Sequence, residues 1–215
     1  MLHVETDTFE HEVIEPLLQC TDPVARRLET DLYRNFYNLA EFDDDWVAPD
    51  YFGVKWETWF HPFGHKVTSH TATDINGNSV GYQFDYVIAD LEDDWDKLGK
   101  ADFGVDTAAS ERYFQAAQEA FGDILPVRMT MQSLGAVPTQ QVVHLMGMEN
   151  MCFAMYDYPE LFKEMMSRIA DDYLAYFDYL AKGGFLCSTT GFELLNQGSK
   201  CFTDDLPAGP ITDIR

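Results

Sequence analysis

The feature that most constrains the fold is a helical apolar period from Pro159 to Lys182, which is followed by two glycines and a short apolar run. Apolar side chains fall on one stripe of a helix, and charged side chains fill the opposite face. Pro159 suits the first helical turn, and the glycines at 183 and 184 suit the end of the helix because glycine accepts left-handed backbone. A buried strand is expected next, over Phe185–Ser188. A long helix that runs into a strand is typical of folds with parallel strands.

Composition sets the size and the class of the protein. The chain has 215 residues, of which 46% are hydrophobic, and this is enough for the core of one domain. Its net charge of −23 disfavours partners rich in phosphate, namely nucleic acid and anionic lipid. The longest apolar runs are too short to cross a membrane, and the acidic N-terminus lacks the apolar segment of a signal peptide. The scattered cysteines Cys20, Cys152, Cys187 and Cys201 indicate reduced thiols and a cytoplasmic location.

The first half of the chain mixes helical and strand patterns. Residues 22–39 predict a helix in which Val24, Leu28, Leu32 and Phe36 recur every four residues, and this stripe needs a partner surface. Residues 53–88 are rich in β-branched and aromatic side chains. The turn sequence at 74–78 predicts a small antiparallel hairpin or meander there.

Helix and strand patterns alternate from residue 107 onward. We expect helices over 107–121 and 138–156, and a strand over 125–134. A strand, one or two helices and the strand at Phe185–Ser188 imply a right-handed crossover to a parallel neighbour. We therefore divide the chain into an N-terminal region of helices and antiparallel hairpin, residues 1–124, and a region of parallel βα units, residues 125–215.

The segment 142–185, VVHLMGMENMCFAMYDYPELFKEMMSRIADDYLAYFDYLAKGGF, resembles the uroporphyrinogen decarboxylase superfamily. The shared features are a strand, a helix with Gly147 and Glu149, a long helix that starts at Pro159-Glu160, and the double glycine. The segment DYVIADLEDDWDKL at 85–98 is similar to the family's region before its barrel. The resemblance is clearest over about residues 80–205. It implies an α/β fold, with a partial (β/α)8 TIM-like barrel after the N-terminal region.

The barrel of that family needs well over 300 residues, so the resemblance implies only the first strands of a barrel. A partial barrel leaves strand edges unpaired. We expect a truncated product, a fragment of a longer protein, or an open α/β variant that covers its edges by self-association. The homo-oligomer is therefore one of the expected partners.

By resemblance, the protein relates to methyl transfer with a corrinoid protein or a methylated small molecule. The family's methyltransferases bind zinc through a His-x-Cys pair and a distant cysteine, and this chain has no His-x-Cys. We therefore expect no metal or cofactor within this chain, with zinc and a corrinoid partner only for a full-length relative. The arginine- and glycine-rich segment of the porphyrinogen decarboxylases is also missing, which disfavours true porphyrinogen decarboxylation.

Barrel geometry supplies the candidate site residues, because functional groups of such folds follow the C-terminal ends of strands. Gln132 and Glu193 are the catalytic candidates, and Ser133 and Asn196 are the candidates for substrate binding. The alternative for all four is ordinary loop polarity and capping.

The histidines offer a second place for chemistry. His61, His65 and His70 form the only histidine cluster of the sequence, and a metal site is one interpretation. The alternative is a hairpin turn, because Pro62 and Gly64 interrupt the cluster. His144 lies between apolar neighbours on a predicted helix, where packing is the favoured role.

A hypothesis from a different class is a non-catalytic binding or assembly module. It explains the short barrel without assigning an active site. The acidic surface would then serve a partner or simply keep the chain dispersed.

Overall fold

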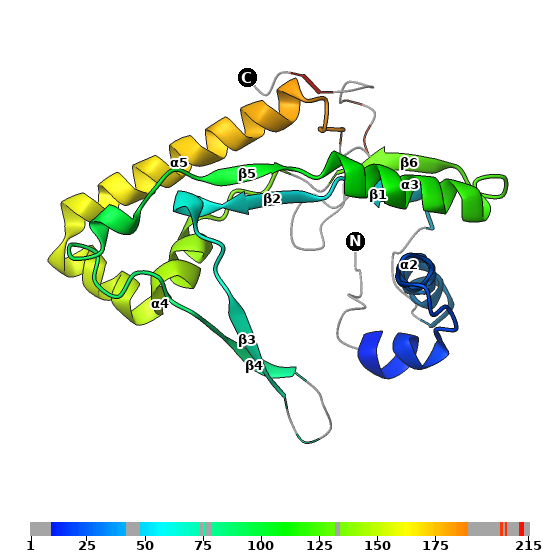
Figure 1. Cartoon of the computed structure of the whole chain (residues 1–215), viewed down its shortest axis with the longest axis horizontal. Coiled ribbons are helices and arrows are strands. Elements are labelled where there is room, and N and C mark those ends of the chain that lie inside the picture. Colours follow the sequence, from blue (N-terminus) through cyan, green and yellow to red (C-terminus); the bar gives the residue numbers. More distant parts are fainter. Residues whose placement is uncertain are drawn as a thin grey trace. The chain divides into compact units, whose positions relative to one another are not determined.

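The computed structural model describes residues 10–41, 48–73, 75, 79–131, 134–188, 203, 205 and 211–212. They form a mixture of helices and short strands, which confirms the expected α/β composition (Figure 1). The helices are α2 (Pro23–Glu41), α3 (Thr107–Phe121), α4 (Pro138–Asp157) and α5 (Pro159–Lys182). The strands are β1 (Phe52–Lys55), β2 (Thr58–His61), β3 (Ser69–Thr73), β4 (Ser79–Phe84), β5 (Asp102–Val105) and β6 (Val127–Thr130). Short helical turns lie at Glu10–Ile14, Glu15–Leu17, Pro62–Gly64 and Trp95–Lys97. None of the helices in the described ranges is long and apolar enough to span a bilayer.

The chain divides into two compact units, each assembled from separate stretches of sequence. The first unit comprises residues 1–57, 106–134 and 185–211, and the second comprises residues 58–105, 135–184 and 212–215. The expected division between residues 124 and 125 falls inside the first unit, between α3 and β6.

The first unit is built on a parallel pair of strands. β1 pairs with β6, with Phe52 opposite Val127 and Lys55 opposite Thr130. Helix α3 packs on both strands, and the core formed there consists of Leu28, Phe52, Val54, Tyr113 and Ala117. A parallel pair with a helix in its connection was expected from the sequence, but between other strands.

The predicted strand at Phe185–Ser188 is wrong, because these residues form no strand ladder with any other described segment, and Leu186 accepts only a single backbone hydrogen bond, from Ile211 at 3.3 Å, among those of the described residues. The ring of Phe185 instead meets Trp56 edge-on, at 4.9 Å between centroids, and Leu186 is buried. The parallel neighbour of β6 is β1, which lies far earlier in the chain. A short apolar run indicates burial, but burial alone does not specify strand pairing.

The second unit contains two antiparallel pairs and the helices α4 and α5. β2 pairs with β5. β3 pairs with β4, and this second pair confirms the predicted hairpin. Helix α5 buries one continuous face: Met165, Ile169, Tyr173, Tyr176, Leu180 and Ala181. Its central part packs with Phe63, Ile88, Leu91, Leu145 and Met146 in the core of this unit.

Helix α4 is interrupted at Gly147, whose φ of 78° is not helical. The interruption frees the carbonyl of Leu145, which accepts hydrogen bonds from the backbone N–H groups of Val87 and Ile88 at 2.7 and 3.1 Å. The ring of Tyr86 lies against Gly147, where an added Cβ would be 2.9 Å from Cζ. The glycine is therefore required both by its backbone conformation and by the space.

The four predicted helices are confirmed with ends that differ by one or two residues. The three sheets of the described residues have two strands each, and none of them closes into a barrel.

Candidate functional site

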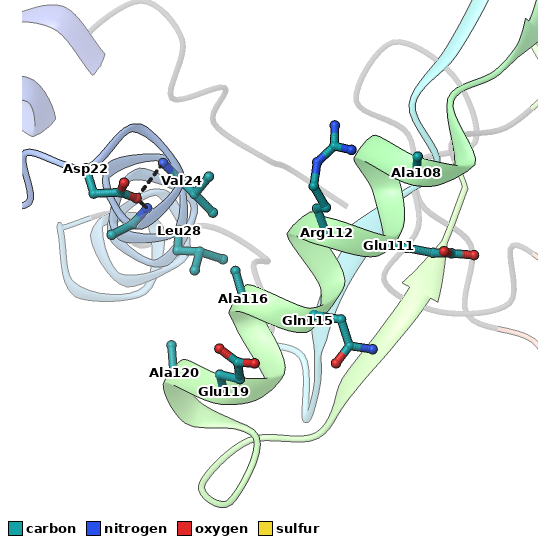
Figure 2. Close-up of a pocket in the computed structure, with 11 residues that line it drawn as sticks. Asp22, Val24, Leu28, Ala108, Glu111, Arg112, Gln115, Ala116, Glu119 and Ala120 are labelled. Atoms are coloured by element: carbon teal, nitrogen blue, oxygen red, sulfur yellow. Dashed lines mark hydrogen bonds between the residues drawn. The ribbon is translucent and has the colours of Figure 1, made fainter.

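The first unit has an open groove of about 910 Å³ between α2 and α3. Figure 2 shows its two walls, with Val24 and Leu28 of α2 pointing toward α3 at Ala116. From α2 and the residue before it, the lining comes from Asp22, Val24, Ala25 and Leu28. From α3 it comes from Ala108, Glu111, Arg112, Gln115, Ala116, Glu119 and Ala120.

Local sequence fixes where each wall begins. The Asp22 carboxylate accepts the N–H groups of Val24 and Ala25, both at 3.0 Å, and Pro23 starts α2. Asp106 caps α3 in the same way, because its carboxylate accepts the N–H of Ala109 at 2.8 Å. Three of the seven α3 lining residues are alanines, which leave space between the longer polar side chains.

Polar contacts clamp α2 to α3 beside the groove. The Tyr113 hydroxyl of α3 donates to the Asp31 carboxylate of α2 at 2.8 Å. The Arg27 guanidinium lies 4.1 Å above the Tyr113 ring and pairs with Glu57 at 2.6 Å. Burial, and then the negative charge of Asp31, raise the pKa of Tyr113, so that its hydroxyl keeps its proton. The clamp holds the groove's walls in register.

The groove combines an apolar floor with an acidic rim. Leu28 is buried in the core of the unit, whereas Val24 beside it is exposed. Asp22, Glu111 and Glu119 lie around the floor, and Arg112 is the single cation among the lining residues. Such a surface suits an apolar ligand with positive charges at its edges.

The four site residues predicted from the sequence, Gln132, Ser133, Glu193 and Asn196, lie outside the described residues. Their roles therefore stay predictions.

The three clustered histidines have separate partners. His61 and His70 lie 3.1 and 2.9 Å from the carboxylates of Asp102 and Asp85, and His65 lies 2.7 Å from the Lys97 carbonyl. In the described part of the chain, no three His, Cys, Asp or Glu side chains are grouped to hold a metal ion. These contacts favour the structural interpretation of the cluster.

His144 packs as its apolar neighbours suggested. Its ring stacks on Phe84, with 4.1 Å between centroids. Burial lowers the pKa of His144, so the neutral ring is favoured in this contact.

Sequence reasoning missed the groove, although one signal pointed to it. The stripe of Val24, Leu28, Leu32 and Phe36 required a partner surface, and only Leu28 obtains full burial. The alanines of α3 were an additional signal, because small side chains on a neighbouring helix leave room for a third element.

Comparisons with protein-family models, with curated proteins and with solved structures find no match for this chain.

Proposed function

We propose that this chain is a binding module whose α2–α3 groove takes an amphipathic helix with basic flanks from a partner protein. The observation that carries the proposal is the uncovered apolar stripe of α2 beside an acidic rim. Helix-in-groove recognition uses this combination, with apolar anchors on one face of the bound helix and charges beside them.

The shape of the groove favours a helix over an extended peptide. Its walls are two helices that are already clamped together, and three of the seven residues that line its α3 side are the alanines Ala108, Ala116 and Ala120. Small side chains allow close approach of a third helix, since helix axes pack about 8–10 Å apart depending on the contact residues. The two-stranded sheet of this unit packs on α3 through the core that contains Tyr113 and Ala117, and neither of these residues lines the groove.

Charge sets the polarity of the partner. The chain carries −23 overall, and the groove has three carboxylates against one guanidinium. Lysines and arginines beside the apolar anchors of the bound helix would meet these carboxylates. An acidic helix of the same apolar pattern would be repelled.

Two labelled peptides test the proposal by fluorescence anisotropy. Both have leucines at helical spacing, and one carries lysines at the flanks where the other carries glutamates. We expect the lysine peptide to bind more tightly, with an affinity that falls as salt is added. Equal affinity for both peptides, or none for either, would overturn the proposal.

A variant pair locates the binding. Ala120→Arg places a long side chain in the groove, and Gln118→Arg makes the same charge change on an exposed position of α3 that does not line it. We expect Ala120→Arg to weaken binding of the lysine peptide about tenfold, which corresponds to about 1.4 kcal/mol. Gln118→Arg leaves it within about twofold. An equal loss in both variants contradicts the groove as the site.

The second candidate is methyl transfer in a uroporphyrinogen decarboxylase-like enzyme. Two observations favour it: the parallel β1–β6 pair with α3 packed on it, and Gly147 of the Gly-x-Glu motif in a conformation that requires glycine. Under this proposal the first unit begins a TIM-like barrel, and Gln132, Ser133, Glu193 and Asn196 line the substrate site in a cytoplasmic enzyme. Zinc and a corrinoid protein would come from outside this chain.

Methylcobalamin is the probe for this second candidate. Titration with the protein is followed by the corrin absorbance, with Glu193→Ala and Gln132→Ala as variants. Saturable binding that both variants weaken supports the candidate. If methylcobalamin does not bind and the lysine peptide does, helix binding in the groove remains the proposed function.

A further inference from the structure

The hairpin of β3 and β4, hereafter the arm, is largely exposed to solvent. All five residues of β3 are exposed, and among the described residues neither strand pairs with a third strand. Figure 1 shows the arm extending away from α4 within the second unit. A lone two-stranded hairpin is only marginally stable in water, so this arm gains much from a partner.

One face of the arm carries the apolar residues of β4 beside two polar residues of β3. Tyr82 and Phe84 alternate along β4 and therefore point to the same side, and Val80 lies next to them at an irregularity in the ladder. At the base, Phe84 stacks on His144 of α4. Farther out, Tyr82 and Val80 are uncovered, with exposed fractions of 68% and 66%. The face is covered at one end and open at the other.

The opposite face of the arm is different. His70 lies opposite Gln83, and Ala72 opposite Gly81, so this side carries small or polar side chains. The two faces therefore provide a matched comparison within the same pair of strands.

The arm is also nearly free of charge in a strongly acidic chain. Residues 67–84 contain one carboxylate, Asp74, and no lysine or arginine, whereas the whole chain carries −23. A cationic partner would be drawn to the acidic surfaces instead. Two copies of this chain repel one another least where their surfaces are neutral, and the apolar face gives them area to bury there.

We infer that the arms of two copies pack together through the Val80–Tyr82 face and so form a homodimer. The contact is isologous, because the same patch serves both chains. It uses a different surface from the α2–α3 groove and does not depend on what the groove binds. Added salt tightens this dimer, because it screens the repulsion between two acidic chains, whereas it weakens the binding of a basic helix.

Sedimentation equilibrium of the full chain tests the inference. We expect the apparent mass to rise from one chain to two between low micromolar and submillimolar concentrations, and the dimer to tighten in high salt. Tyr82→Lys holds the mass at one chain, whereas Gln83→Lys, on the opposite face, keeps the dimer. The milder Tyr82→Thr introduces a β-branched residue, which strands also favour, and weakens the dimer about tenfold or more, about 1.4 kcal/mol.

Three results would overturn the inference. They are a mass of one chain at every concentration, a dimer that Tyr82→Lys and Tyr82→Thr leave unchanged, and an equal loss of dimer in Gln83→Lys. Near-UV circular dichroism of each variant confirms that its aromatic packing matches the wild type, so that a loss of dimer is not a loss of fold.

Discussion

Helices α2 and α5 have the same amphipathic sequence pattern, but the apolar stripe is buried in α5 and largely exposed in α2. Each begins at a proline and has an apolar stripe at helical spacing opposite charged residues. In α5 the stripe is covered, and Met165, Ile169 and Leu180 are at most 1% exposed. In α2 only Leu28 is buried, while Val24, Leu32 and Phe36 are 41%, 40% and 58% exposed.

The difference lies in what each unit supplies opposite the helix. Aromatic rings fill the α5 face, where Phe60 stacks on Tyr173 at 4.3 Å between centroids and contacts Tyr176. Alanines lie opposite α2, and they leave a groove. An amphipathic pattern thus identifies the face that seeks burial, and the partner of that face is decided elsewhere in the chain. An unburied stripe is then a candidate binding surface.

The largest expected effect comes from shortening one apolar side chain on each helix. Ile169→Ala leaves a cavity in the core and is expected to lower the free energy of unfolding by about 2–5 kcal/mol. Phe36→Ala removes an exposed side chain and changes it by less than about 0.5 kcal/mol. Urea unfolding, followed by circular dichroism, measures both.

Equal effects of these two substitutions would break the comparison. A large loss for Phe36→Ala would mean that the α2 stripe is covered in the chain by itself, and the groove proposal would lose its support. Binding of the lysine-flanked peptide should then be remeasured with Phe36→Ala, since Phe36 continues the stripe beyond the groove.

An intermediate effect is expected at the break in α4, the helix that packs on α5. Gly147→Ala forces a side chain into positive φ and against the Tyr86 ring, and is expected to cost about 1–3 kcal/mol. Gly135→Ala is the matched control, because its Cβ meets nothing within 4 Å. Urea unfolding of both variants gives the difference. Equal stability would mean that the break is not needed to cover α5.

Local pattern was enough to predict the helices and the hairpin. Pro159 and the glycines at 183 and 184 bounded α5, and the turn sequence at 74–78 predicted the pairing of β3 with β4. These features depend on neighbours in sequence, which periodicity and turn chemistry report directly.

The pairing of β6 could not be predicted in the same way. Its partner β1 is separated from it by a complete helix and two other strand pairs, and the apolar run at Phe185–Ser188 was an equally good local match. The groove could not be predicted for the same reason, because the residues near Val24 in sequence do not indicate that the alanines of α3 lie opposite them. The break at Gly147 also escaped, because a glycine within a helical pattern is usually tolerated.

The smallest expected effect is a pH dependence of stability at two carboxylates, Glu29 of α2 and Asp172 of α5. Their pKa values are shifted in opposite directions. Hydrogen bonds from the N–H groups of Cys20 and Gln19 lower the pKa of Glu29, so its stabilising contribution is present at neutral pH and is lost as the pH falls through its folded value. Burial raises the pKa of Asp172, so its protonated form favours the folded state and that contribution is lost as the pH rises through its folded value. At neutral pH, Glu29→Gln should therefore lower stability. Asp172→Asn should raise it, by less than about 1 kcal/mol because water screens a partly exposed carboxylate.

Urea unfolding at neutral and at acid pH measures both, and each difference from wild type should shrink in acid. Effects of the same sign at neutral pH would mean that the packed α5 face imposes no burial penalty on its flanking charge, and the contrast between the two helices would then rest on apolar contacts alone.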